Sequence, residues 1–182
     1  VILAEKHFNL NEIGACNMHF ATEDGYILVG ERYSEIIEAD PPYSNVSGTV
    51  LKIDLNGNLI WSQYVESDSL RVFFNRISRL DNDRFLITGS ANFIDPIQYE
   101  RMRNGQIDHW YPCIIINSNG EILHKYYYSC IQHGSINTSI PTIDGNFILI
   151  GDISAADDVY DVVGNYIEKA TPDGRVLWRK EY

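Results

Sequence analysis

The sequence has 182 residues, of which 45% are hydrophobic and 12% aromatic, so it is too apolar for a disordered protein and long enough to bury a core. Its formal net charge of −11 would repel a phosphate backbone, so we expect neither nucleic acid nor an anionic membrane as a partner. No apolar run approaches the roughly 20 residues of a membrane-spanning helix, and three cysteines do not make a disulfide scaffold.

The chain repeats the same order of short runs, rich in β-branched and aromatic residues, three times. The runs of the first repeat predict β-strands at residues 16–22, 26–32, 48–54 and 59–65. The three units span residues 9–65, 66–128 and 129–182. Residues 1–8 resemble the end of the third unit, so we interpret them as the outer strand of a preceding unit. No segment has a sustained helical period.

Glycine marks the same two places in every repeat. One glycine ends the predicted second strand, at Gly30, Gly89 and Gly151. Another lies in the hairpin between the third and fourth strands, at Asn56-Gly57, Asn119-Gly120 and Asp173-Gly174. Tight turns between the first and second strands are expected at Asp24-Gly25, Asp81-Asn82-Asp83 and Asp144-Gly145. Because Asn-Gly and Asp-Gly accept positive φ angles, we expect two-residue hairpins at these dipeptides.

Four antiparallel strands repeated at this period are typical of the blades of a β-propeller. We therefore predict an all-β fold of three four-stranded antiparallel blades plus one extra outer strand, within a larger ring of about 6–8 blades. A β-sandwich is the main alternative, but it does not require the same hairpins at the same places three times over. Three blades alone would leave two open sheet edges. Either the chain belongs to a longer polypeptide or two copies build a six-bladed ring, and the surplus strand at 1–8 favours the first.

The run LKIDLNGNLIW at 51–61 resembles the third-to-fourth-strand motif of PQQ-like, quinoprotein-type propeller repeats. The run DGYILVG at 24–30 resembles bacterial cell-surface relatives of that family. In the family a tryptophan of the fourth strand packs between blades; Trp61 and Trp178 match it, whereas His124 departs from it. The resemblance implies a secreted bacterial protein, located outside the cell, on its surface or in the periplasm. It does not imply a quinone cofactor, because no two cysteines are adjacent.

The connections between second and third strands carry the irregular sequence, near residues 31–47, 91–111 and 154–163. Irregular loops on a rigid scaffold usually hold binding sites, and aromatic and arginine side chains are typical of binding hot spots. We therefore expect binding on the face that these long loops form. The candidate residues are Tyr33, Tyr43, Tyr99, Arg101, Arg103, His109 and Trp110. The alternative is that the loops are solvated surface without a ligand.

Two groups of residues could bind a metal ion, one Ca²⁺ and the other Zn²⁺. We expect no other cofactor. Asp157, Asp158 and Asp161 offer the oxygen ligands that Ca²⁺ prefers, although an acidic run is also typical of a solvated face. If Asn119-Gly120 is a hairpin turn, residue 113 lies opposite about 126 and residue 109 opposite about 130. The pairing would gather one set of ligands suited to Zn²⁺, namely His109, Cys113, Cys130 and His133. A Cys113–Cys130 disulfide, or ordinary buried thiols and surface histidines, are the alternatives.

The sequence contains no catalytic motif: it has no Gly-x-Ser-x-Gly, no glycine-rich phosphate loop and no His-Glu-x-x-His. We therefore expect a non-enzymatic binding or scaffold module that binds a protein or a glycan through the long-loop face. Two alternatives stay open. The chain is a component of an envelope or secretion assembly, or it is part of a lyase or hydrolase whose site lies at the axial mouth of the complete ring, where residues of several blades would converge.

Overall fold

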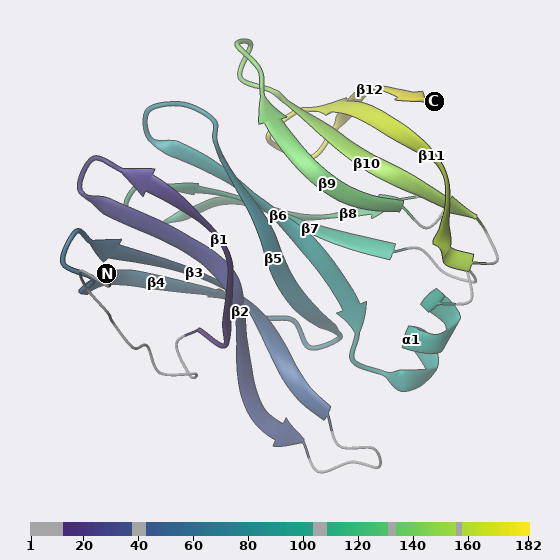
Figure 1. The fold of residues 1–182 in the computed structure, drawn as a ribbon, viewed down its shortest axis with the longest axis horizontal. Helices are drawn as coiled ribbons and strands as arrows, with labels where there is room; N and C mark the ends of the chain where they lie inside the picture. Colours follow the sequence, from purple (N-terminus) through teal and green to yellow (C-terminus); the bar gives the residue numbers. More distant parts are fainter. Residues whose placement is uncertain (1–12, 38–42, 104–108, 131–133, 156–157) are drawn as a thin grey trace, which may run out of the picture.

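The computed structural model describes residues 13–37, 43–103, 109–130, 134–155 and 158–182. These residues form three four-stranded antiparallel sheets and one short helix (Figure 1). The all-β prediction with three such sheets is therefore confirmed, while the extra strand expected at residues 1–8 lies outside the described residues. The helix of the described ranges is too short to cross a membrane.

Each sheet is a meander in which strands adjacent in sequence are adjacent in space. The first sheet consists of β1 (Ala15–Thr22), β2 (Gly25–Ile37), β3 (Tyr43–Asp54) and β4 (Leu59–Val65). The second consists of β5 (Leu70–Arg79), β6 (Arg84–Phe93), β7 (His109–Asn117) and β8 (Ile122–Cys130), with helix α1 (Pro96–Arg103) between β6 and β7. The third consists of β9 (Gly134–Pro141), β10 (Phe147–Ala155), β11 (Asp158–Ala170) and β12 (Val176–Glu181).

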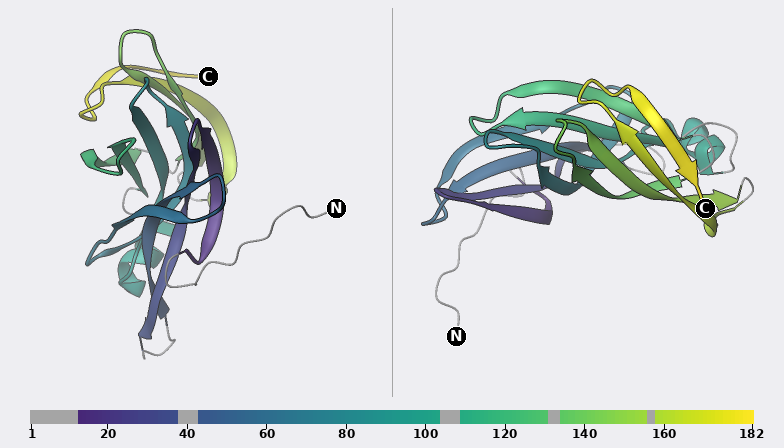
Figure 2. Two further views of the ribbon diagram at one scale, coloured as in Figure 1. Left: turned by 90° about the vertical axis from the view of Figure 1, so that its left-hand side faces the viewer. Right: turned by 90° about the horizontal axis from the view of Figure 1, so that it is seen from above.

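The second sheet lies between the first and the third (Figure 1). Strand β5 contacts both β1 and β9, so the first strands of the three sheets meet at the centre of the molecule. Seen from above in Figure 2, the sheets follow an arc, and the described residues do not close a ring.

The middle sheet is buried on both faces. Ile114 and Ile116 of β7 belong to the core shared with the first sheet, where they join Val50. Ile115, which lies between them, belongs to the core shared with the third sheet, where it joins Leu149. Successive side chains of a strand point to opposite faces, so this unbroken apolar run fills two cores at once.

The predicted hairpin positions are correct, but the turns between third and fourth strands contain three residues rather than two. At the first of them the Gly57 amide donates to the Asp54 carbonyl at 3.0 Å and the Asp54 amide donates to the Asn58 carbonyl at 2.9 Å. The same pair of hydrogen bonds recurs at 117–121 and 171–175, and also at 142–146, which joins the first two strands of the third sheet. This is a type I turn followed by one residue in the left-handed region, which glycine adopts freely. The φ angles of Gly57, Gly120, Gly145 and Gly174 are 79°, 85°, 77° and 86°.

A side chain selects this turn in preference to the two-residue form. Oδ1 of Asp54 accepts hydrogen bonds from the backbone amides of Asn56 at 2.8 Å and Asn58 at 2.7 Å. Asn117 makes the equivalent bonds to Asn119 and Glu121. Such Asx contacts stabilise a turn locally, so the residue three positions before the glycine helps to set the loop length.

Two of the three long loops expected between second and third strands consist largely of β-strand. β2 continues to Ile37 and β3 begins at Tyr43, with Tyr33 paired to Val46. In the third sheet β10 ends at Ala155 and β11 begins at Asp158. The polar composition of these segments was misleading because backbone pairing in an exposed ribbon does not require an alternating apolar face.

The connection in the second sheet contains α1, which the sequence pattern did not predict. Asp95 caps the helix: its Oδ1 accepts from the amide of Ile97 at 2.8 Å, and its carbonyl accepts from the amide of Tyr99 at 2.9 Å. Pro96 occupies the first helical position, where its missing N–H and fixed φ cost nothing. The apolar residues Ile97 and Met102 of the helix do not recur with a helical period, so only the Asp-Pro pair signals its start.

Candidate functional site

Three asparagines occupy the same position in the three sheets, each as the extra residue of a β-bulge. In the first sheet Cys16 pairs with Gly30 and Met18 pairs with Val29, which leaves Asn17 without a partner in the ladder. The same register shift makes Asn75 of β5 the extra residue beside Gly89, and Asn137 of β9 the extra residue beside Gly151. A bulge bends its strand and re-aims the side chain that it carries. The repeat therefore presents one amide from the first strand of every sheet.

The glycine opposite the bulge is needed because the two strands approach closely there. A Cβ atom at Gly30 would lie 1.8 Å from the carbonyl oxygen of Ala15, and a Cβ at Gly89 would lie 1.8 Å from that of Phe73. No side chain fits at these distances. The glycines expected to end the second strands thus lie inside them, since β2 and β6 both continue for several residues beyond.

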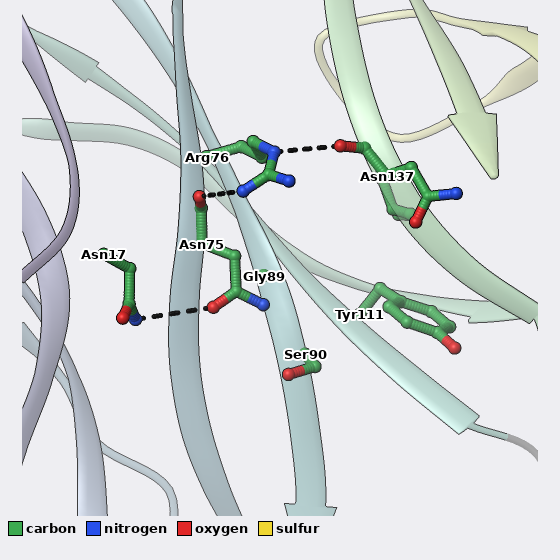
Figure 3. Close-up of a pocket in the computed structure, with 8 residues that line it drawn as sticks. Asn17, Asn75, Arg76, Gly89, Ser90, Tyr111 and Asn137 are labelled. Carbon is green, nitrogen blue, oxygen red and sulfur yellow. Dashed lines mark hydrogen bonds between the residues drawn. The ribbon is translucent and has the colours of Figure 1, made fainter.

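The three bulges surround a hollow of about 470 Å³ at the centre of the molecule (Figure 3), which we call the bulge pocket. Its lining comes from β1, β5, β6, β7 and β9 and therefore from all three sheets. The lining residues are Asn17, Asn75, Arg76, Gly89, Ser90, Tyr111, Ile136 and Asn137.

Side chains of the bulge pocket link the three sheets to one another. Nδ2 of Asn17 donates to the Phe74 carbonyl at 2.9 Å and lies 3.5 Å from Oδ1 of Asn75. Arg76 donates from Nε to the Asn137 carbonyl at 2.9 Å and from Nη1 to the Asn75 carbonyl at 2.8 Å (Figure 3). The guanidinium thus binds backbone carbonyls of two bulged residues, which the irregular ladder leaves available.

The bulge pocket is built for hydrogen bonding and carries one positive charge. Among its lining residues Arg76 is the charged one, and none is a carboxylate, a histidine or a cysteine. Glu31, which is 8% exposed, lies behind Asn17 and accepts from its Nδ2 at 2.6 Å and from the Tyr33 hydroxyl at 3.3 Å. The lining offers amides, a guanidinium and the hydroxyls of Ser90 and Tyr111, all of which can bind a ligand by hydrogen bonding.

A second hollow, of about 300 Å³, contains one of the predicted binding residues. Trp110 lies at the start of β7, beside Phe93 at the end of β6 and Leu70 at the start of β5. Tyr127 completes the apolar lining, and Ser67 and Ser69 add polar groups from the link between the first two sheets. Because Phe93 ends β6 and Trp110 lies near the start of β7, this Trp110 hollow lies at the end of the second sheet from which the connection through α1 leaves.

The other predicted binding residues do not gather around Trp110. Tyr33 lies on β2 of the first sheet, while Tyr99 and the exposed Arg101 lie on α1. His109 precedes Trp110 on β7 and is partly buried. The side chains of Tyr43, in β3, and Arg103, at the end of α1, lie outside the described residues.

The predicted hairpin register around the cysteines is confirmed, but it does not bring the proposed zinc ligands together. Cys113 pairs with Tyr126 and His109 pairs with Cys130. Four residues along a strand separate Cys113 from this second pair by about 13 Å, which exceeds both a shared tetrahedral site and a disulfide. The side chain of Cys113 is fully buried.

The remaining candidate ligands are not described. Asp157 and His133 lie outside the described residues, as do the side chains of Asp158, Asp161 and Cys130. Within the described ranges no group of three or more His, Cys, Asp or Glu residues is arranged to hold a metal ion. The calcium site stays a prediction.

A buried carboxyl group lies in the core between the second and third sheets. Glu168 of β11 is 2% exposed and points to the same face as Tyr166, two residues before it. Burial raises the pKa of Glu168 to about 7, against the opposing effect of Arg179, whose Nη1 lies 3.8 Å from Oε2. Burial, followed by the neighbouring Cys113, also raises the pKa of the Tyr126 hydroxyl. This interface therefore contains a group that titrates near neutral pH.

No family model matches the chain. No curated protein matches it either. Among solved structures, the chain is similar to a protein of unknown function from Bacteroides caccae, with a TM-score of 0.42 and 12% sequence identity over 84% of this chain. The chain spans 41% of the length of that protein. The resemblance to quinoprotein-type repeats accordingly stays a prediction.

Proposed function

We propose that the chain forms part of a larger β-propeller that acts as a non-enzymatic binding module, with the Trp110 hollow as its contact site for a protein partner. The observation that carries this proposal is the lining of the hollow, in which Trp110, Phe93, Leu70 and Tyr127 surround a half-open space. Large aromatic side chains in a desolvated recess are typical of binding hot spots. An apolar side chain of a protein fits this lining better than the hydroxyl-rich surface of a glycan.

A comparison of the aromatic residue that each sheet packs against the next sheet supports the larger ring. Trp61 of β4 covers the hairpin of the second sheet: its Nε1 donates to the Ser118 carbonyl at 3.2 Å, and its ring lies against Gly120. In the second sheet Tyr126 takes this role and lies against Gly174 of the third. Trp178, which has the position of Trp61 in the third sheet, is 40% exposed.

The last sheet therefore carries a docking residue with no hairpin to cover in the described part of the chain. Its neighbours Val176 and Leu177 are also exposed, at 46% and 42%. Exposed apolar groups beside an open sheet edge favour a further partner. We infer that an additional blade packs there, from a longer polypeptide in preference to a second copy.

Selection of peptides from a displayed random library on the immobilised protein tests the binding site. We expect enriched peptides to share an aromatic or large aliphatic residue, and Trp110→Ala to weaken their binding about tenfold or more. Trp178→Ala is the matched control, because it removes a tryptophan from another sheet and should leave peptide affinity unchanged. Equal binding by Trp110→Ala, or no enrichment at all, would contradict the proposal. Retention on a glycan array that depends on Trp110 would assign the hollow to a glycan instead.

A further inference from the structure

The bulge pocket is separate from the Trp110 hollow and shares none of its lining residues. Burial does not explain its asparagines, because Asn17 and Asn137 are exposed. The residues around them also differ, since the local sequences are Cys-Asn-Met, Phe-Asn-Arg and Ile-Asn-Thr. What the three repeats keep is an amide on a bulge that faces the centre.

The orientation of the Asn17 and Asn75 amides follows from their partners. Nδ2 of Asn17 must face the Glu31 carboxylate and the Phe74 carbonyl, because only the nitrogen can donate to both. Those two bonds use both hydrogens of that nitrogen, so Oδ1 of Asn75, 3.5 Å away, is at most a weak third acceptor, and Nδ2 of Asn75 lies on the side of Ser90 and Tyr111 (Figure 3). Among the described residues, Oδ1 of Asn17 and Nδ2 of Asn75 have no hydrogen-bond partner. The pocket thus keeps one amide acceptor and one amide donor for a ligand.

Arg76 adds a fixed positive charge. Two backbone carbonyls hold its Nε and Nη1, so its orientation is set before any ligand binds, and Nη2 is left without a partner among the described residues. The charge is local, because the sequence as a whole carries −11 and the pocket lining contains no carboxylate. A pre-organised guanidinium is suited to a carboxylate group.

We propose that the bulge pocket binds a sugar acid, with the carboxylate on Arg76 and neighbouring hydroxyls on the amides of Asn75 and Asn17. Hydroxyl groups both donate and accept, which matches the free oxygen of one amide and the free nitrogen of the other. The volume of about 470 Å³ is sufficient for one or two sugar rings. The ligand is a uronic acid, either free or at the end of a glycan.

Calorimetric titration with D-glucuronate tests this inference, with D-glucose as the neutral analogue of the same shape and sulfate as an anion without a sugar ring. We expect saturable binding of glucuronate, and binding of glucose and sulfate at least about tenfold weaker. A glucuronate-terminated disaccharide that binds more tightly than the monosaccharide would identify the end of a glycan as the source. Equal affinity for sulfate would reduce the site to a general anion site and overturn the proposal, as would the absence of saturation by glucuronate.

Two variants assign the binding to the pocket. Arg76→Gln should weaken glucuronate binding about tenfold or more, whereas Arg79→Gln, further along the same strand, should leave it unchanged. Because Arg76 also links two sheets, Asn75→Asp serves as a second variant: it keeps the shape and the oxygen that accepts from Asn17, but adds a charge that repels the ligand. Unchanged affinity in either pocket variant, with thermal unfolding confirming a folded protein, would overturn the proposal.

Discussion

The two faces of the middle sheet meet their neighbours in different ways. Toward the first sheet the core is made of aliphatic residues and phenylalanine, as in the packing of Phe74 with Ile87 and Val50. Toward the third sheet it includes the tyrosines Tyr111, Tyr128 and Tyr166, and Glu168 lies beside them. The same backbone repeat thus supports an apolar interface and a partly polar one. The repeat therefore specifies the strands and turns, while the side chains packed between the sheets vary and determine which interface responds to pH.

The largest expected effect comes from the apolar interface. Phe74 is fully buried and its ring lies against Gly48 of the first sheet, so Phe74→Ala leaves a cavity that neither sheet can close. We expect a loss of about 3–5 kcal/mol in the free energy of unfolding, measured by urea denaturation. Leu55→Ala, in a turn where the side chain is 67% exposed, is the control and should change it by less than about 0.5 kcal/mol. A loss below about 1 kcal/mol for Phe74→Ala would show that the first two sheets do not share this core.

Glu168→Gln tests the polar interface. The pKa of Glu168 is raised from 4.5 to about 7, so the unfolded chain ionises first as pH rises and the folded state loses relative stability between these values. Glutamine keeps the shape without the charge. We expect the free energy of unfolding of Glu168→Gln, measured by urea denaturation at pH 8, to exceed that of the original protein by up to about 3 kcal/mol. This difference should shrink toward zero as the pH falls to 4.5.

Glu23→Gln, at an exposed turn, is the matched control for the pH series and should give no such trend. A pH-independent advantage for Glu168→Gln, or a loss of stability at pH 8, would mean that Arg179 already compensates the buried carboxylate.

A smaller effect separates the two equivalent tryptophans. Trp61→Phe removes the hydrogen bond to the Ser118 carbonyl and part of the cover over Gly120, and we expect it to cost about 1–2 kcal/mol. Trp178→Phe should cost less than about 0.5 kcal/mol, because this side chain is 40% exposed and its indole has no such bond to another described residue. Thermal unfolding followed by circular dichroism measures both. Equal losses would contradict the assignment of Trp178 to an unfilled docking position.

The strands and their register were accessible from the sequence because hairpins are local. Positive-φ glycines fix the turns between third and fourth strands, and once a turn is fixed the pairing of the flanking strands follows, as the predicted pairs 113 with 126 and 109 with 130 illustrate. The same arithmetic could not place Cys113 and His109 together, because residues four apart in a strand are on one face but far apart along it. The predicted length of the turns between third and fourth strands was wrong, because this length depends on a side chain, Asp54 or Asn117, in addition to the glycine.

The bulge pocket was missed because it depends on contacts between sheets. Asn17, Asn75 and Asn137 come from strands of different repeats, and the alternation of apolar residues does not reveal a bulge at an exposed position. A signal was present: each asparagine precedes its repeat glycine by 13 or 14 residues, at Gly30, Gly89 and Gly151. In the sequence alone, the glycine is typical of a turn. Only the close approach of the first and second strands at the bulge shows why a glycine is required there.

The first strands of the three sheets present their bulged asparagines to a common pocket. Nuclear Overhauser effects in solution can test this arrangement. We expect contacts from the side-chain amide protons of Asn17 to Phe74 and Asn75, and from the Arg76 Nε proton to Asn137. A regular ladder through Asn75, with no contact from β1 or β9 to this part of β5, would contradict it.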